Sequence, residues 1–211
     1  MGTPTMPSTF ERATEYLLDQ GSTDQVVQDY ADYFRSYTGR HFEEFISRSD
    51  PTRFTSEDLA ALSCLGVELK GGAVAELLVT RADELNELLN APDMPDTTAD
   101  LRHVDKAVIA DTSPLSSTYN RLKTIDGIGY VRASKLLAAK RPALVPIRDR
   151  VVERFLNAGD AWWAPYLGIV QDPQLVDRVQ ELSEHVPERV TLLRRVDVAL
   201  WMAGKRHTAG S

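Results

Sequence analysis

The hydrophobic positions of the chain recur every three or four residues in most of its segments, which is the spacing of one face of a helix. Phe10, Ala13 and Leu17 follow this spacing near the N-terminus, and a second set lies within residues 26–34. A row of leucines over residues 77–89 predicts a longer helix. No segment sustains the strict alternation that is typical of a half-buried strand. The pattern therefore predicts an all-α fold.

Capping signals support the same helices. Thr55 and Asp58 form an acidic variant of the capping box ahead of an apolar stretch. Residues 113–114 (Ser-Pro) and 172–173 (Asp-Pro) each read as an N-cap followed by proline at the first helical position. The last helix is predicted over residues 188–202, where valines and leucines again recur at helical spacing.

Residues 115–140 have the features of a helical hairpin. They read LSSTYNRLKTIDGIGYVRASKLLAAK, with two glycines between two predicted helices. Glycine permits a positive φ and lets a foreign backbone come close. The second helix then begins with unpaired N–H groups and a positive dipole end, which suit a phosphate. This predicts a helix-hairpin-helix that contacts a nucleic-acid backbone through Gly127, Ile128, Gly129, Tyr130, Arg132, Lys135 and Arg148. An ordinary corner between two helices is the alternative.

The charge of the chain is unevenly distributed. Its net charge is −7, yet residues 121–154 hold nine basic and three acidic residues and carry +6. The remaining residues therefore carry −13. An acidic total argues against a surface that coats nucleic acid generally. It is compatible with a local contact at the basic segment.

Residues 115–156 resemble the helix-hairpin-helix of the DNA glycosylase superfamily, whose hairpin precedes a Gly/Pro-rich loop and a catalytic aspartate. Here the hairpin continues as KRPALVPIRDRVVERFL, in which Pro142 and Pro146 would form the loop. Asp149 follows Gly127 by 22 residues, as in endonuclease III-type members. The full chain also looks like an uncharacterised bacterial protein family, through SKLLAAKRPALVPIRD and LLRRVDVALW.

The resemblance implies a glycosylase-like, two-lobed fold with Asp149 at the mouth of a cleft, and a role in DNA repair. The Asp149 carboxylate would stabilise an oxocarbenium-like sugar, or align water, once a base has been extruded from the duplex. Val131 stands where lyase-type members have a lysine, which implies a monofunctional hydrolase without a Schiff base. The sequence departs from the family where Asp126 replaces a proline and where Arg150-Val151 replaces Thr-His.

Two other interpretations use the same residues. An aspartate at the start of the segment VVERFL is also what a simple N-cap looks like. The chain would then be a non-catalytic nucleic-acid-binding module, or a protein-interaction domain, which suits the acidic remainder. Trp162, Trp163 and Trp201 would line a base pocket in a glycosylase, although tryptophans in small helical domains usually anchor the core.

The domain organisation follows from the breaks between helices. We expect tails at residues 1–9 and 208–211 and one all-α domain over residues 10–207. Its two lobes would be residues 10–96 together with 161–207, and residues 97–160 with the hairpin.

Composition also limits the kinds of cofactor, cross-link and cell compartment that this chain can have. A single cysteine, Cys64, excludes an intramolecular disulfide and a cysteine-held iron–sulfur cluster. The four histidines lack the spacing of metal ligands, so we expect no metal and no cofactor. Neither a signal peptide nor an apolar run of about 20 residues is present, which predicts a cytoplasmic protein with no membrane contact. We expect a monomer whose partner is DNA.

Overall fold

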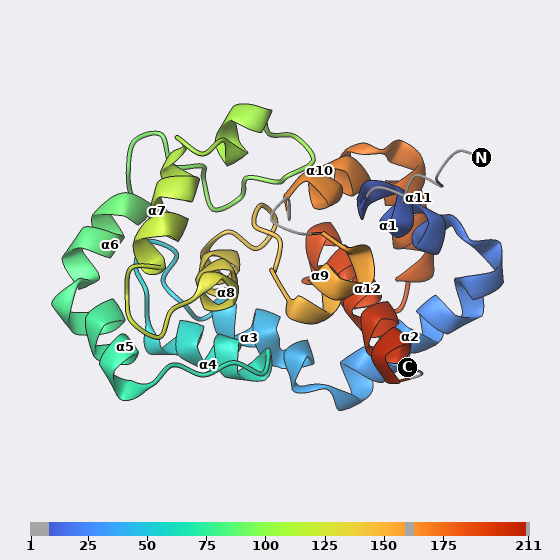
Figure 1. Ribbon diagram of the computed structural model, residues 1–211, viewed down its shortest axis with the longest axis horizontal. Coiled ribbons are helices and arrows are strands. Elements are labelled where there is room, and N and C mark those ends of the chain that lie inside the picture. Colours follow the sequence, from blue (N-terminus) through green and yellow to red (C-terminus); the bar gives the residue numbers. More distant parts are fainter. Residues whose placement is uncertain (1–8, 159–162, 210–211) are drawn as a thin grey trace, which may run out of the picture.

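The computed structural model describes residues 9–158 and 163–209, and within them the fold is all-helical, as predicted, with no strand (Figure 1). The α-helices are α1 (Thr9–Leu18), α2 (Thr23–Ser36), α3 (Phe42–Ile46), α4 (Ser56–Cys64), α5 (Gly71–Ala75), α6 (Ala82–Leu89), α7 (Pro114–Leu122), α8 (Tyr130–Lys140), α9 (Arg150–Leu156), α10 (Trp163–Gln171), α11 (Pro173–Leu182) and α12 (Leu192–Ala209). Four short helices complete the fold: η1 (Gln20–Ser22), η2 (Thr38–His41), the π-helical η3 (Glu76–Thr80) and η4 (Lys106–Ile109).

The helices fall into two groups that lie side by side (Figure 1). Helices α3 to α8 form one group, in which α4 packs on α3 and α8, and α7 packs on α6 and α8. Helices α1, α2 and α9 to α12 form the other, in which α12 packs on α2 and α9. The grouping differs from the predicted lobes in two places. Helices α3 to α6 lie with the hairpin rather than with the C-terminal helices, and α9 lies with α12.

The predicted helix starts at three capping sequences are confirmed. The Thr55 N–H donates to Asp58 Oδ2 at 2.7 Å, which is half of a capping box. The Ser113 hydroxyl accepts from the N–H of Ser116 at 3.1 Å at the start of α7. Asp172 accepts from the N–H of Gln174 at 2.9 Å at the start of α11. Each side chain satisfies an N–H that the helix itself cannot.

Two predicted helices have different bounds. The leucine row over residues 77–89 is interrupted at Arg81, whose φ of −117° and ψ of 16° are not helical and whose N–H donates to Glu76 O, five residues back, at 2.9 Å. The last helix begins at Leu192 rather than at residue 188, because Thr191 is its cap: the Thr191 hydroxyl accepts from the N–H of Arg194 at 3.2 Å. It then continues to Ala209, into the predicted tail.

Helix α8, the second helix of the hairpin, is buried over most of its length. Every residue from 133 to 140 is buried, including the charged Lys135 and Lys140. The charged groups in this buried part of the helix must lie against partners, since an unpaired charge in an interior is costly. Among the described residues, no helix is long and apolar enough to cross a membrane.

Candidate functional site

The turn between α7 and α8 is built on an apolar frame. Leu122, Ile125 and Ile128 are buried, and the N–H of Ile128 donates to Ile125 O at 2.9 Å. Gly127 has a φ of +83°, the left-handed conformation that glycine adopts without strain. Gly129 precedes α8 with an extended backbone (φ −78°, ψ 180°), and a Cβ placed there would meet no atom within 4 Å. The first turn of α8 therefore faces open space at Gly129, while Ile128 anchors the turn in the core.

Asp149 begins α9 and has two partners. Its Oδ1 accepts from the N–H of Val151 at 2.9 Å, so the predicted N-cap is confirmed. Its Oδ2 lies 3.0 Å from Lys135 Nζ, which also donates to Leu65 O at 3.1 Å. The Lys135 side chain is 3% exposed, whereas that of Asp149 is 19% exposed. Of this ion pair, only the carboxylate is within reach of solvent.

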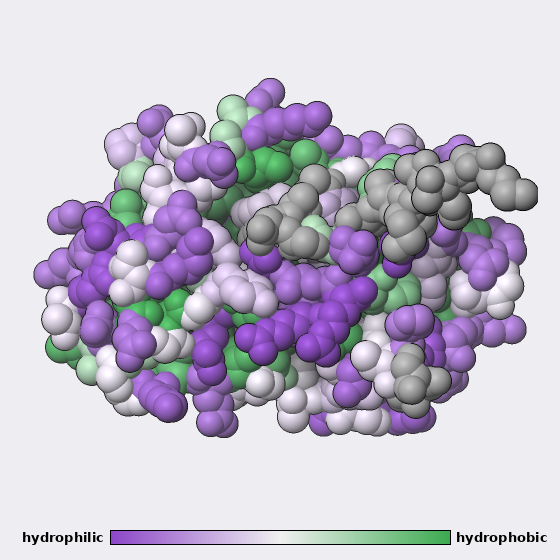
Figure 2. Space-filling view, in the orientation of Figure 1, coloured by the Kyte–Doolittle hydropathy of each residue, from purple (hydrophilic) through white to green (hydrophobic). Residues whose placement is uncertain are grey.

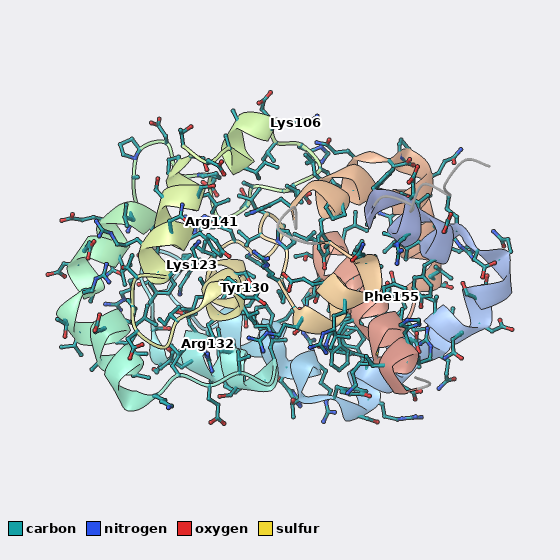
Figure 3. The ribbon with its side chains drawn as sticks, viewed as in Figure 1. Lys106, Lys123, Tyr130, Arg132, Arg141 and Phe155 are labelled. Atoms are coloured by element: carbon teal, nitrogen blue, oxygen red, sulfur yellow. The ribbon has the colours of Figure 1, made fainter. Side chains whose placement is uncertain are left out.

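The carboxylate opens into an outer cavity of about 330 Å³. Its walls come from the start of α8, from the start of α9, and from the segment that follows α4. They include Gly129, Arg132 and Asp149, so the first turn of the hairpin helix and the carboxylate border one space. Tyr130 and Arg132 lie at this end of α8, near the middle of the molecule, in Figure 3.

An inner cavity of about 180 Å³ lies beyond the ion pair. It shares Leu65, Gly66, Lys135 and Asp149 with the outer cavity, and its other walls include three aromatic and two charged side chains: Tyr33, Tyr37, Trp201, Arg194 and Asp197. The rings of Tyr33 and Tyr37 stack at 5.7 Å, and Trp201 meets Tyr37 edge-on at 5.2 Å. The size suits one flat ring rather than a drug-sized ligand, whose pockets begin at about 300 Å³.

A buried charged cluster forms the back of the inner cavity. Arg194 forms an ion pair with Asp197 and donates to the Tyr33 hydroxyl, and the Tyr166 hydroxyl donates to Asp197 Oδ1 at 3.3 Å. Burial raises the pKa of Asp197 to about 6, against the opposing effect of Arg194. Burial likewise raises the pKa of Tyr33 to about 12. The inner cavity thus has aromatic walls and a fixed polar base.

The other predicted contact residues are placed less simply. Arg132 donates to Glu68 O at 2.9 Å and is half-buried. Arg148 forms an ion pair with Glu153, and its guanidinium lies 4.3 Å from the centre of the Tyr130 ring. Lys135, the third predicted contact, lines the outer cavity, but its side chain is only 3% exposed and its ammonium is engaged with Asp149 and with Leu65 O.

The basic segment is also less basic at its surface than its sequence indicates. Of its nine cations, Lys135, Lys140 and Arg141 are buried. Arg141 donates to Pro95 O at 2.7 Å and so holds a loop rather than a ligand. Figure 2 shows hydrophilic side chains over much of the middle of this face. Any electrostatic attraction there depends on the surface-exposed part of the segment, which includes Lys123, Arg150 and Arg154.

Sequence reasoning missed the partner of Asp149 and most of the inner cavity. Lys135 lies one helical turn after Val131, so the two face the same way, but only the fold shows that Asp149 lies opposite. Arg194 and Asp197, three residues apart on α12, carried a helical-pair signal that was also consistent with a solvated face. Trp201 lines the inner cavity, Trp163 packs against the core, and Trp162 lies outside the described residues.

A family model described as "Family of unknown function (DUF6308)" matches residues 24–204. No curated protein and no solved structure matches the chain.

Proposed function

The chain belongs to this family of unknown function, and we propose from its site that it is a DNA-binding hydrolase that removes a base by cleaving an N-glycosidic bond. One observation carries the proposal: Asp149 lies between an outer cavity bordered by the hairpin and an inner cavity with aromatic walls. An enzyme that acts on an extruded base needs these two spaces with a reactive group between them.

The outer cavity is where a phosphate would bind. The N–H groups of the first turn of α8 have no partners within the helix, and the helix dipole favours an anion there. Gly129 leaves room for the backbone of a nucleic acid to approach. Such contacts hold the strand without reading its sequence.

The inner cavity would receive the base. Tyr37 and Trp201 offer ring faces and edges for stacking, which every base can use. Asp149 would then lie beside the sugar, where its negative charge stabilises the positive charge that develops at C1′. The C1′–N bond breaks with its electron pair on the base, water adds its hydroxyl to C1′, and a proton reaches the base. The products are a free base and an abasic sugar.

Lys135 has a positioning role in this proposal. Its ammonium lies 3.0 Å from Asp149 Oδ2, while the N–H of Val151 donates to Oδ1 of the same carboxylate. Charge-assisted bonds of this kind fix a carboxylate in one orientation. We expect no Schiff base at Lys135, so borohydride reduction during turnover should trap no covalent complex with DNA.

A non-catalytic binding module is the second candidate. One observation favours it: both carboxylate oxygens of Asp149 already have partners, as they would in a purely structural cap. The two candidates share the hairpin contact and differ only in the need for the Asp149 charge.

Asp149→Asn separates them. Asparagine caps a helix about as well as aspartate, so the variant removes the charge but not the cap. Duplexes that carry uracil, alkylated purines or oxidised bases are incubated with each protein and then treated with alkali. We expect strand breaks with the parent chain and a loss of about 10²-fold or more in the variant, the order of a lost electrostatic contact in an active site. Asp172→Asn, the same change at the cap of α11, is the matched control and should keep full activity.

Breaks that persist in Asp149→Asn, or none with any duplex, would end the hydrolase proposal. Binding is measured separately, as the affinity for duplex DNA at increasing salt. We expect log K to fall with log salt, and Gly129→Val to abolish binding while the fold is retained. Gly72→Val, at an exposed glycine on α5 with equal space, is the control. An affinity that does not respond to salt would contradict phosphate contact.

A further inference from the structure

Helices α9 and α12 cross closely beside the two cavities that Asp149 borders. A Cβ placed on Gly204 of α12 would lie 2.7 Å from Val151 Cγ1 and 3.0 Å from Val151 O, so the absence of a side chain lets the two backbones approach. Arg150 precedes Val151 and lines the outer cavity, and Lys205 follows Gly204. The crossing therefore brings together the backbones of two basic residues that are far apart in the sequence.

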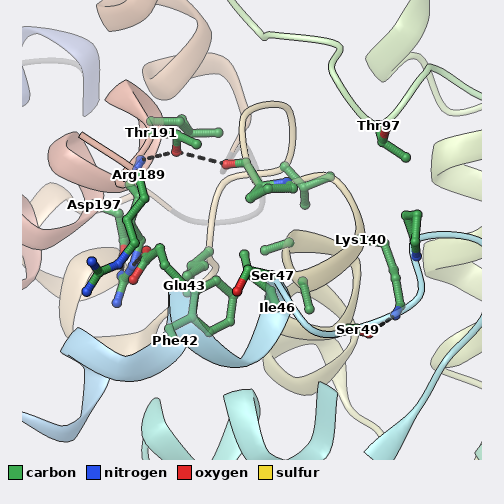
Figure 4. A pocket seen from close by; sticks show the side chains of 18 residues that line it. Phe42, Glu43, Ile46, Ser47, Ser49, Thr97, Lys140, Arg189, Thr191 and Asp197 are labelled. Carbon is green, nitrogen blue, oxygen red and sulfur yellow. Dashed lines mark hydrogen bonds and ion pairs between the residues drawn. The ribbon is translucent and has the colours of Figure 1, made fainter. Parts of the chain in front are cut away.

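The two helices are strongly basic. Together they hold six basic and two acidic residues, in a chain whose net charge is −7. Both acidic residues already have a cation: Glu153 pairs with Arg148, and Asp197 pairs with Arg194. The second of these pairs belongs to the interior, where both of its residues line a cavity of about 410 Å³ (Figure 4). Neither carboxylate is left to balance the cations at the surface of α9 and α12.

Three of the six cations are exposed: Arg150, Arg154 and Lys205. Among the described residues, none of the three forms an ion pair or a hydrogen bond through its side chain, and the Lys205 ammonium lies 5.6 Å from the centre of the Trp201 ring. Arg150 and Arg154 are one helical turn apart and so share a face of α9. Trp201 is a wall of the inner cavity, as Arg150 is of the outer one. A single exposed cation is solvated by water, whereas three beside one pair of cavities form a local positive patch.

We propose that these three residues, the α9–α12 edge, are a second contact for the phosphate backbone of DNA, on the group of helices that does not hold the hairpin. The hairpin holds the strand on one side of the extruded nucleotide, and the edge holds it on the other. A nucleic-acid strand uses both the charge and the aromatic cavity beside it, whereas an acidic protein surface would use only the charge. The inference rests on the DNA contact of the proposed function but not on its chemistry, because the edge supplies charge and no reactive group.

The salt dependence of DNA binding counts the phosphates that the edge contacts. Each phosphate that a cation neutralises contributes about −0.9 to the slope of log K against log salt on duplex DNA. The affinity of the full chain for a duplex is measured by fluorescence anisotropy between about 50 and 200 mM salt. The variants are Arg150→Gln, Arg154→Gln, Lys205→Gln and the three changes combined. We expect each single change to make the slope shallower by about 0.9, and the triple variant to make it shallower by about 2.7.

Lys106→Gln is the matched control, since Lys106 is also exposed but lies on η4, at the upper edge of the molecule in Figure 3. It should leave the slope unchanged, and an equal change there would overturn the proposal by showing an effect of total charge. The triple variant should lose the same fold of affinity for two duplexes of unrelated sequence, because backbone contacts carry no sequence information. Circular dichroism checks that each variant is folded.

The outcomes separate this inference from the proposed function. If the triple variant keeps the slope of the parent chain while Gly129→Val loses binding, the second contact is wrong and the proposed function stands. If the parent chain has no affinity for DNA at low salt, both are wrong.

Discussion

The ion pair between Lys140 and Asp58 joins α8 to α4 in the interior of the hairpin group. Both side chains are 0% exposed, and the two charged atoms lie 2.5 Å apart. Lys140 Nζ also donates to the Ser49 hydroxyl at 2.7 Å and to Asp50 O at 2.8 Å. Burial lowers the pKa of Lys140, and Asp58 opposes that effect. Every donor of the ammonium group is thus engaged without water.

Lys140→Met tests what this pair contributes. Methionine fills the space of the lysine stem, but the Asp58 carboxylate is left buried without its cation. Breaking a buried pair in this way costs about 3–5 kcal/mol. Asp58 keeps its bonds from Thr55 N and from the Ser49 hydroxyl, so we expect a value near the lower end, about 3 kcal/mol. For a chain of this size, the melting temperature should fall by about 6–12 °C.

Urea unfolding followed by circular dichroism gives the free energy of unfolding for each variant. Lys106→Met is the control, since Lys106 is exposed on η4 (Figure 3), and should change stability by no more than about 0.5 kcal/mol. In Lys140→Met with Asp58→Asn, the buried charge is gone, and we expect the double variant to be more stable than Lys140→Met alone. If Lys140→Met unfolds at the same urea concentration as Lys106→Met, the buried pair between Lys140 and Asp58 does not stabilise the fold.

Three further predictions concern the site and its frame. Because the pKa of Asp197 is raised to about 6 from the ordinary 3.8, the folded protein holds this proton more tightly than the unfolded chain. The contribution of this proton to the free energy of unfolding is therefore complete below about pH 4 and falls by on the order of 3 kcal/mol as the pH rises through 6. Asp197→Asn should flatten this part of the profile of unfolding free energy against pH. A pH profile unchanged in the variant would show that another group titrates there. Gly127→Val forces a branched side chain to a φ of +83° and should lower the free energy of unfolding by about 1–3 kcal/mol, whereas Gly129→Val should not. Gly39→Ala places a Cβ onto the Tyr33 hydroxyl, so Tyr33 must move and its stacking on Tyr37 should be lost, which an unchanged tyrosine resonance pattern in NMR would contradict.

The fold class and several helix starts could be predicted because they depend on local chemistry. Ser113 and Asp172 cap helices through atoms within three residues of themselves, and the apolar frame of the hairpin is contiguous in sequence. The Asp149 cap belongs to the same kind of signal. Each of these interactions is specified without knowledge of any other segment.

The remainder of the site depends on contacts that cross the chain. Lys135 meets a carbonyl 70 residues away, and Arg194 meets Tyr33 over a separation of 161 residues. The sequence shows Lys135 as a cation on the second helix of a hairpin, which is as consistent with a phosphate contact as with a buried pair. The helices group differently from the predicted lobes for a similar reason, since α9 packs on α12 and no local pattern specifies that pairing.

The division of the chain between the two groups of helices has a consequence for its synthesis. One group, α3 to α8, is continuous in the sequence, whereas the other combines α1 and α2 with helices that follow residue 149. The ribosome completes the continuous group first, while α1 and α2 wait for partners that emerge several seconds later at about 5–20 residues per second. The inner cavity beside Asp149 has walls from both groups, among them Trp201 of α12, so it forms only after α12 has been made. A nascent chain that has already folded its hairpin therefore still lacks the inner cavity.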